Sequence, residues 1–331
     1  MNKEMKKLRI VYLGTPEFAA TCLEALLKGR HEVVGVVTAP DRESGRGRII
    51  TQSDVKKLAL ERGLPIAQPE RLRSEEFLET LKGWNADLGV VVAFRMLPEV
   101  VWSMPKMGTV NLHGSLLPQF RGAAPIQRAI MAGATESGAT TFLLTGSIDK
   151  GDMLGQVVVP IGPNENAGSL HDRILESGKY LLAKTVDDLA DGVAQTIPQA
   201  EVISELNVDI LDAHKLFKED RKISWLRSAG DLHNHIRGLA PYPGAFTTLH
   251  DAPEIPVKIL EARAANDHSG ELEVGEISIH EGRMYVGCGK SVQENGNGIL
   301  EILRIQPPGK GAMDAGSYLR GLRDEITHFT V

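Results

Sequence analysis

The sequence has little cysteine. Of its 331 residues only two, Cys22 and Cys288, are cysteines, and neither belongs to a CxxC pair. We therefore expect two buried free thiols that pack as small apolar side chains. Free thiols persist in a reducing compartment, which favours the cytoplasm.

Long apolar runs are also missing. No uninterrupted apolar stretch approaches the ~18 residues of a transmembrane helix, so no membrane span is expected. The first residues, Met1–Lys7, are basic and lack the apolar region and small-residue cleavage site of a signal peptide. These features predict a cytoplasmic protein that does not associate with membranes.

The sequence has no excess of positive charge. It contains 37 Lys and Arg against 43 Asp and Glu, a net charge of −6. The overall field therefore repels nucleic acid, and any RNA contact must depend on local basic clusters. Hydrophobic residues make up 42% of the chain, enough for a packed core, and its length indicates about two domains.

The first half alternates short runs of apolar residues with segments of helical spacing. Such strands are buried on both faces of a parallel sheet. The pattern predicts an α/β domain with a Rossmann-like, doubly wound, mostly parallel sheet, whose ligands bind beyond the carboxyl ends of the strands. The predicted strands are Leu8–Gly14, Glu32–Thr38, Pro65–Ala67, Leu88–Ala93, Thr109–His113 and Ala139–Leu144, and the predicted helices are Pro16–Lys28, two that begin near Ser53 and Ser74, and Ser169–Leu189.

The second half has a different pattern, with five short strands and hairpin signals such as Glu281-Gly282. This pattern predicts a small OB-like β-barrel and leaves a β-sandwich as the alternative. We expect an N-terminal domain of residues 1–190, a linker of residues 191–207 and a C-terminal domain of residues 208–331.

The densest chemical signal is the run Asn111-Leu-His-Gly-Ser-Leu-Leu-Pro118, at the end of a predicted strand. Asn111 and His113 are two residues apart, so both side chains point to the same face. An amide beside an imidazole can stabilise the oxyanion that forms when a carbonyl is attacked. The structural alternative is a histidine with ordinary hydrogen bonds and an asparagine that forms a turn.

Two polar loops accompany this run. Asp149 follows the strand Ala139–Leu144 in a glycine-containing loop, from which a carboxylate could reach His113 and orient its ring. The loop Pro40–Arg48 contains Arg42, Arg46 and Arg48 among glycines, and a guanidinium there can pair with phosphate or stack on a base. Taken singly, each loop is also compatible with an exposed polar turn.

Together and in this order, the three elements resemble the methionyl-tRNA formyltransferase family. The run Ser115–Pro118 is typical of folate-dependent formyltransferases in general, whereas the arginine loop and the C-terminal half make the resemblance specific. The resemblance extends over nearly the whole chain. Further matching strings are Gly14-Thr-Pro-Glu-Phe18, Ile236-Arg-Gly238, Pro241-Tyr-Pro243 and Gln306-Pro-Pro-Gly-Lys310.

The resemblance implies transfer of a formyl group from 10-formyltetrahydrofolate to the α-amino group of methionyl initiator tRNA, without a metal. It implies a catalytic trio of Asn111, His113 and Asp149. It also implies a folate-binding segment of Ser115, Leu116, Leu117 and Pro118. Implied tRNA contacts are Arg46 with its neighbours Arg42 and Arg48, in a loop that closes on the acceptor end, and the basic residues Lys215, Lys218, Arg221, Lys222 and Lys310 of the second domain.

The sequence departs from the family pattern at two places. Phe94-Arg95 replaces a Tyr-Gly segment and is one residue shorter, so the resemblance does not determine this wall of the folate pocket. Ser147 and Lys150 replace family residues in the second loop, while Asp149 is retained. We expect a monomer.

Other functions compete with this hypothesis. A sugar-nucleotide N-formyltransferase or a 10-formyltetrahydrofolate hydrolase would use the same trio, although a small sugar does not need a loop like that around Arg46. A non-catalytic RNA-binding module would have no reason to place Asn, His and Asp around a pocket. A dinucleotide-binding oxidoreductase is disfavoured because Gly14-Thr-Pro-Glu lacks the GxGxxG pattern. A zinc site is disfavoured because the side chains of His233 and His235 diverge on a helix.

Overall fold

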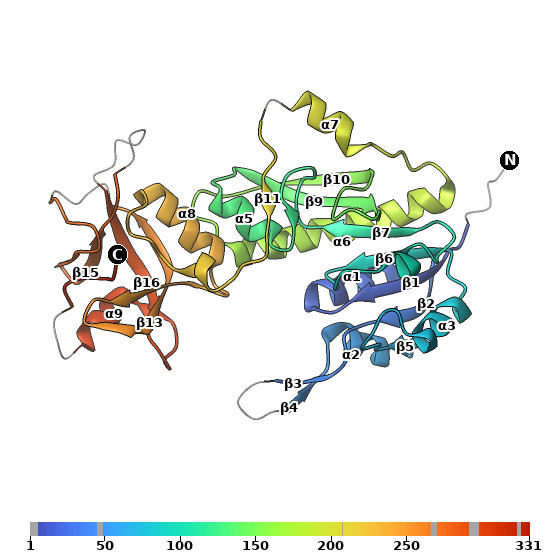
Figure 1. The fold of residues 1–331 in the computed structure, drawn as a ribbon, viewed down its shortest axis with the longest axis horizontal. Helices are drawn as coiled ribbons and strands as arrows, with labels where there is room; N and C mark the ends of the chain where they lie inside the picture. The colour runs from blue at the N-terminus through green and yellow to red at the C-terminus, as the bar shows by residue number, and fades with distance from the viewer. Residues whose placement is uncertain (1–5, 45–48, 207, 266–269, 291–297, 323–325) are drawn as a thin grey trace. The chain divides into compact units, whose positions relative to one another are not determined.

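The structure is a computed structural model that describes residues 6–44, 49–206, 208–265, 270–290, 298–322 and 326–331 (Figure 1). The chain folds into two compact units. The first comprises residues 1–122, 137–159 and 172–212, and the second comprises residues 123–136, 160–171 and 213–331. Sequence patterns predicted continuous domains, because local patterns do not reveal that two short internal segments pack with the second unit.

The first unit is built on a seven-stranded sheet. Its strand order is β10-β9-β7-β6-β1-β2-β5, and the five strands from β7 to β5 are parallel. The predicted α/β fold class is therefore confirmed, with the addition that β9 runs antiparallel to β7. The strands are β1 (Arg9–Gly14), β2 (Glu32–Val37), β5 (Ile66–Ala67), β6 (Leu88–Val92), β7 (Thr109–His113), β9 (Glu136–Leu143) and β10 (Met153–Pro160).

Helices connect these strands, and their starts follow from the sequence. In α2 the Ser53 hydroxyl accepts a hydrogen bond from the Lys56 amide at 3.1 Å, as expected for an N-cap serine. The acidic residues Glu75 and Glu76 occupy the first turn of α3, where the helix dipole favours them. The helices of the first half and the connecting region are α1 (Glu17–Leu27), α2 (Asp54–Glu61), α3 (Glu75–Gly83), α4 (Glu99–Trp102), α5 (Pro125–Met131), α6 (Ala167–Asp191) and α7 (Gln199–Glu205).

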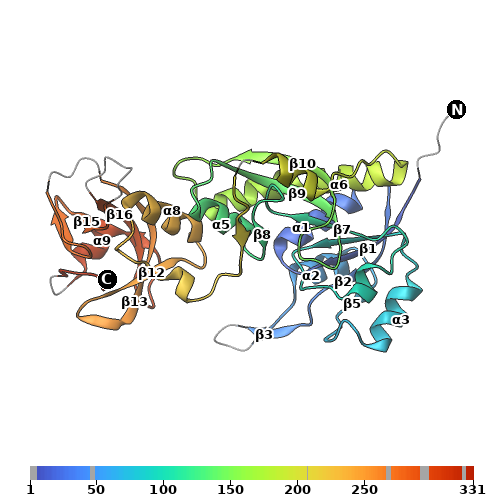
Figure 2. The same cartoon turned by 45° about the horizontal axis from the view of Figure 1, so that its top comes forward.

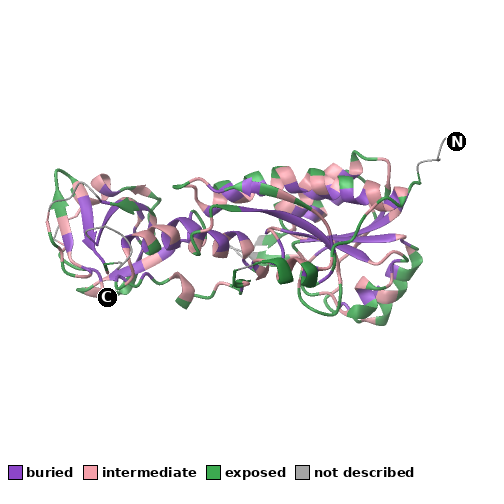
Figure 3. Ribbon diagram, turned by 90° about the horizontal axis from the view of Figure 1, so that it is seen from above, coloured by how far each residue is buried: buried purple, intermediate pink, exposed green. Residues whose placement is uncertain are grey.

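The central strands of the first unit are buried on both faces, as their continuous apolar sequences require (Figure 3). One apolar cluster joins Val11 and Leu13 of β1 to Phe77 and Leu81 of α3. A short hairpin of β3 (Arg42–Ser44) and β4 (Ile49–Thr51) projects from the body of this unit (Figures 1 and 2). In the described part of the chain, no helix is both long and apolar enough to cross a membrane.

The second unit contains an antiparallel sheet of order β12-β13-β16-β15-β14, with β17 paired to β16. Its strands are β12 (Ala245–Leu249), β13 (Ala252–Ala264), β14 (Ile277–His280), β15 (Arg283–Gly287), β16 (Ile299–Gln306) and β17 (Met313–Asp314). The remaining elements are β8 (Arg121–Gly122) and β11 (Asp212–Ala213), the 3₁₀ helix η1 (Glu219–Arg221), and the helices α8 (Ala229–Leu239) and α9 (Ala315–Arg320).

The C-terminal residues join the two ends of this sheet. Thr330 N–H donates to Thr248 O of β12 at 2.8 Å, and Phe329 N–H donates to Gly275 O, just before β14, at 2.8 Å. Residues 327–330 therefore lie between the two edge strands and close the sheet into a barrel, which removes its exposed edges. Short strands spaced by turns predicted the barrel, but the closing segment has no strand signal of its own.

The barrel core depends on an aromatic pair. Trp225 is fully buried, stacks on Phe329 with ring centroids 5.3 Å apart, and donates from Nε1 to Thr247 Oγ1 at 3.1 Å. Because Phe329 belongs to the closing segment, this pair links the core to the closure of the sheet.

We expect Phe329→Ala to lower the free energy of unfolding of the second unit by about 3–5 kcal/mol, the usual cost of removing a buried aromatic ring. Urea unfolding followed by near-ultraviolet circular dichroism measures this change. The control is Leu226→Ala, next to Trp225 but 67% exposed, which should change stability by less than about 0.5 kcal/mol. Equal effects of the two substitutions would contradict the role given to Phe329.

Candidate active site

Asn111 and His113 lie on β7, at the carboxyl end of the parallel strands. β7 is flanked by β6, which is parallel, and β9, which is antiparallel. Asn111 is half-buried, and its side-chain amide has no hydrogen-bond partner among the described residues. The amide is therefore free to donate to a ligand at the edge where such sheets bind ligands.

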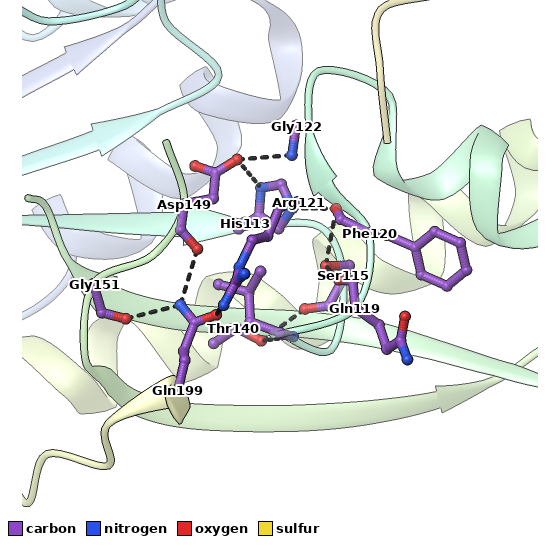
Figure 4. A network of polar contacts seen from close by, with 11 residues as sticks. His113, Ser115, Gln119, Phe120, Arg121, Gly122, Thr140, Asp149, Gly151 and Gln199 are labelled. Carbon is purple, nitrogen blue, oxygen red and sulfur yellow. Dashed lines mark hydrogen bonds and ion pairs between the residues drawn. The ribbon is translucent and has the colours of Figure 1, made fainter. Parts of the chain in front are cut away.

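Each nitrogen of the His113 ring faces a polar group, and Nε2 is held by a hydrogen bond. The side chain is 7% exposed, with Nε2 2.9 Å from the carbonyl oxygen of Phe120 and Nδ1 3.8 Å from Asp149 Oδ2. A carbonyl oxygen can only accept, so Nε2 carries the hydrogen and donates it. Nδ1 is then the atom left for chemistry, and it faces the carboxylate (Figure 4).

The segment after His113 is folded into a tight loop by buried hydrogen bonds. The Ser115 hydroxyl donates to Gln119 O at 2.7 Å, and Thr140 Oγ1 donates to Ser115 O at 2.7 Å. Thr140 Oγ1 also accepts from the Leu117 amide at 3.0 Å. The side chains of Ser115, Leu117 and Pro118 are buried in this loop, while Leu116 is partly exposed.

Asp149 is brought to His113 by the loop between β9 and β10. Its Oδ2 accepts a hydrogen bond from the Gly122 amide at 2.9 Å, besides its contact with His113. The backbone of Asp149 is left-handed, with φ of 51°, a conformation that costs a non-glycine residue about 1–2 kcal/mol. The structure thus brings His113 and Asp149 together and places Asn111 on the same strand as His113.

Two neighbouring side chains, those of Gln199 and Arg121, received no role in the sequence analysis. Gln199 is 3% exposed and donates from Nε2 to Asp149 O at 2.9 Å and to Gly151 O at 2.8 Å. Its Oε1 accepts from Arg121 Nε at 3.0 Å and from Arg121 Nη2 at 2.6 Å. Gln199 lies in the segment that was expected to be a linker, and no local pattern indicates a contact with a residue 50 positions earlier.

Close packing around this loop affects the pKa of Arg121 and the choice of residue at position 151. Burial lowers the pKa of the Arg121 guanidinium, and the charges of Asp212 and Asp149 oppose that shift. Gly151 has to be glycine, because a Cβ atom there would lie 1.6 Å from Leu143 O. Gly151 is thus required for the Asp149 loop to approach the backbone of β9 this closely.

The shortened segment Phe94-Arg95 lies beyond the end of β6. Arg95 donates from Nη1 to Glu70 O at 2.8 Å and from Nη2 to Pro69 O, and its guanidinium lies 5.7 Å from the centroid of the Phe94 ring. Burial lowers the pKa of Arg95, and the charge of Arg42 lowers it further. Arg95 therefore ties this segment to the loop that precedes α3.

Of the predicted arginines of the first unit, Arg42 is described and Arg46 and Arg48 lie outside the described residues. Arg42 is exposed on β3, opposite Thr51 of β4. The base of the hairpin is fixed by Asp41, which pairs with Lys56 at 2.6 Å and accepts from Gln68 at 2.8 Å. The hairpin thus presents Arg42 to solvent from a fixed base.

A basic pocket of about 380 Å³ lies on the second unit. The sheet register places Phe246 beside Lys258 and Lys258 beside Gln306, on one face of three adjacent strands. Arg221 covers the Phe246 ring, with its guanidinium 5.7 Å from the ring centroid. The pocket is lined by Lys218, Arg221, Phe246, Pro256, Lys258, Gln306, Pro307, Pro308 and Gly309.

One wall of this pocket is the turn Gln306–Lys310, which was singled out from the sequence. The Lys310 amide donates to Pro307 O at 3.2 Å, and Gly309 has φ of 70°. Proline and glycine at the two central positions favour such a turn, because proline fixes φ at the first and glycine permits positive φ at the second. Lys310 is exposed at the end of this turn.

The described residues contain no group of three His, Cys, Asp or Glu side chains arranged to hold a metal ion. Cys22 and Cys288 are both buried free thiols, as predicted. Burial raises the pKa of Cys22 to about 12, although the charge of Lys179 opposes this shift. Because the thiol stays protonated at neutral pH, it is unreactive.

The chain matches known proteins over both units. The family model described as formyl transferase matches residues 8–186, and the model described as formyl transferase, C-terminal domain, matches residues 215–323. A methionyl-tRNA formyltransferase of Bacteroides fragilis is 43% identical over 322 residues, which cover 96% of each chain. One of Flavobacterium johnsoniae is 44% identical over 320 residues, covering 96% of this chain and 97% of the relative.

Solved structures support the fold. An N-formyltransferase from Helicobacter canadensis, in complex with folinic acid and dTDP-3-aminofucose, has a TM-score of 0.62 and 18% sequence identity, with coverage of 89% of this chain and 98% of that one. The two units, the polar residues at the end of β7 and the full-length relatives lead to one conclusion: the chain belongs to the methionyl-tRNA formyltransferase family.

Proposed function

We propose that this chain transfers the formyl group of 10-formyltetrahydrofolate to the α-amino group of methionyl initiator tRNA. The observation that carries the proposal is the free amide of Asn111 beside the His113–Asp149 pair, in a chain that matches its family over both units. The proposal includes a cytoplasmic, monomeric enzyme without a resident metal.

The reaction is a direct acyl transfer. The uncharged α-amino group attacks the formyl carbon, and the carbonyl oxygen of the resulting tetrahedral centre becomes an oxyanion. Asn111 donates to this oxygen from its side-chain amide, and protonated His113 stabilises it from Nδ1. Collapse of the centre breaks the bond to N10 of the folate, and the proton lost by the amine passes to N10.

Asp149 serves this chemistry through His113. Its carboxylate orients the ring and balances the imidazolium charge that the oxyanion needs nearby. The 3.8 Å between Nδ1 and Oδ2 exceeds a direct hydrogen bond, so the two groups interact as an ion pair when the ring is protonated. The Asp149 carboxylate is then the group that can accept the amine proton, directly or through water, and pass it on to N10.

Folate binds along the Ser115–Pro118 loop. Because Ser115, Leu117 and Pro118 are buried, the loop would contact the cofactor through its backbone and through the partly exposed side chain of Leu116. The buried hydroxyls of Ser115 and Thr140 support this by keeping the loop in one conformation.

The tRNA is bound by two local basic regions, as the net charge of −6 requires. The arginine loop, with Arg42, Arg46 and Arg48, contacts the acceptor end. In the second unit the basic pocket accepts backbone phosphate, and the exposed Lys310 directly follows its lining residue Gly309. The lysines Lys218 and Lys258 have no carboxylate partner among the described residues, so their charge is available to a phosphate.

The rival activities have weaker support. The likeness to the N-formyltransferase in complex with dTDP-3-aminofucose is a likeness of fold at 18% identity, whereas the two methionyl-tRNA formyltransferases are 43–44% identical over 96% of this chain. A hydrolase would use the same trio, with water in place of the amine.

We expect purified protein to formylate methionyl initiator tRNA with 10-formyltetrahydrofolate as the donor. The assay includes charged elongator tRNA and an amino-sugar nucleotide as competing acceptors. Formyl release to water alone, or transfer to the sugar alone, would contradict the proposal and retain only its folate-dependent part.

Asn111→Ala and His113→Ala should each lower kcat by about 10²–10³-fold, the usual effect of losing one oxyanion donor. KM for both substrates should change little, because the lost contact forms in the transition state. The control is Asn164→Ala, an exposed loop asparagine, which should retain full activity. A rise in KM with unchanged kcat would show that these residues bind substrate and do not stabilise the transition state.

Lys218→Gln combined with Lys258→Gln should weaken tRNA binding and leave KM for the folate unchanged. Each lysine that neutralises one phosphate contributes about 0.7–0.9 to the slope of log K against log salt concentration, so the double variant should lose up to about twice that amount. Filter binding over a salt series measures it, and Lys290→Gln, which removes one charge elsewhere on the second unit, is the control for each of the two single-lysine variants. An unchanged slope would remove the pocket from the tRNA-binding surface.

A further inference from the structure

Gln199 occupies a position that the proposed reaction has not yet used. It is the first residue of α7, and its side chain is buried against the loop that carries Asp149. The surrounding loop residues 145–148 and Lys150 are exposed, so they give the loop little packing of their own. Hydrogen bonds must therefore hold Asp149 in place.

The amide of Gln199 uses its full hydrogen-bonding capacity. Its two N–H groups donate to Asp149 O and Gly151 O, at 2.9 and 2.8 Å, and its oxygen accepts twice from Arg121, at 3.0 and 2.6 Å. Carbonyl oxygens only accept and a guanidinium only donates, so the amide has one possible orientation. A side chain with four such bonds has no freedom to rotate.

These bonds form a closed ring around Asp149. The amide nitrogen of Gln199 binds the backbone oxygen of Asp149, and its amide oxygen binds the side chain of Arg121. Arg121 directly precedes Gly122, whose amide donates to the Asp149 carboxylate at 2.9 Å. Gln199 thus connects the loop of Asp149 to the segment that binds its carboxylate (Figure 4).

The left-handed backbone of Asp149 explains why these hydrogen bonds are needed. With φ of 51°, Asp149 is in a conformation that an unrestrained loop would leave. Its carboxylate must nevertheless stay 3.8 Å from His113 Nδ1. Removing the amide of Gln199 would leave the carbonyls of Asp149 and Gly151 and the Arg121 guanidinium without these partners.

We propose that Gln199 is a positioning residue, which sets the Asp149 carboxylate against His113 by holding the Asp149 backbone and Arg121 together. The inference rests on the proposed function, since it assigns Gln199 to the same reaction. Gln199 itself does not touch the reacting atoms.

Gln199→Ala should lower kcat by about 10–100-fold, because a displacement near 1 Å at a reacting group can cost 10²-fold. KM for folate and for tRNA should stay within about 3-fold. Gln199→Glu should be similarly slow, since it keeps its size and its acceptor for Arg121 but loses both donors to the loop. The control is Gln195→Glu, an exposed residue in the same segment, which carries the same charge change and should retain full activity.

A double-mutant cycle separates positioning from a general structural role. If Gln199 acts through Asp149, adding Gln199→Ala to Asp149→Asn should slow the reaction by less than about 2-fold more. Additive losses, unchanged kcat in Gln199→Ala, or a loss that matches the unfolded fraction in thermal unfolding would overturn the inference.

A measurement independent of turnover separates this inference from the proposed function. The ring nitrogen resonances of His113, assigned by their absence in His113→Gln, should shift in Gln199→Ala and stay unchanged in Gln195→Ala. Unchanged resonances in Gln199→Ala would overturn the positioning role even if formyl transfer is confirmed. If the resonances shift but the wild-type protein does not formylate tRNA, the shift would support the positioning role of Gln199, and the missing formylation would contradict only the proposed function.

Discussion

A single hydrogen bond, from His113 Nε2 to the carbonyl oxygen of Phe120, decides which ring nitrogen the site can use. Because the carbonyl must receive a hydrogen, Nδ1 is left to face Asp149. Phe120 is in turn held by its own amide, which donates to Leu211 O at 2.7 Å. The orientation of the candidate catalytic histidine therefore depends on a loop that returns from more than 90 residues further along the chain.

The same dependence on distant segments recurs in the rest of the site. The Ser115–Pro118 loop is fixed by Thr140 of β9, and the loop of Asp149 is fixed by Gln199 of α7. The bond between Leu117 and Thr140 and the bond from Gln199 to Gly151 O are buried, and their polar groups would be costly to leave unpaired. The preorganisation that the proposed oxyanion site needs would thus come from supporting residues outside the proposed catalytic trio.

The distribution of charge explains how an acidic chain can bind RNA. Carboxylates are numerous overall, but they are absent from the lining of the basic pocket of the second unit. Lys258 of β13 lines this pocket together with Lys218 and Arg221, which lie at the start and end of η1, and Arg221 reaches the sheet through its contact with the Phe246 ring of β12. Because salt screens exposed charges beyond about 10 Å, the proposed contact with RNA would depend on this local cluster more than on the net charge of the chain.

The sequence by itself determined the parallel strands β1, β2, β5, β6 and β7, the placement of Asn111 and His113 on one face, and the Gln306–Lys310 turn. These features follow from local rules: the two-residue period of a strand, runs of β-branched residues, and the backbone preferences of proline and glycine. Only the tertiary structure decided the antiparallel β9, the barrel closure by residues 327–330 and the contacts of Gln199. Each of these depends on a pairing between segments far apart in the chain, and hydrogen bonds of that kind leave no periodic signal in the sequence around either partner.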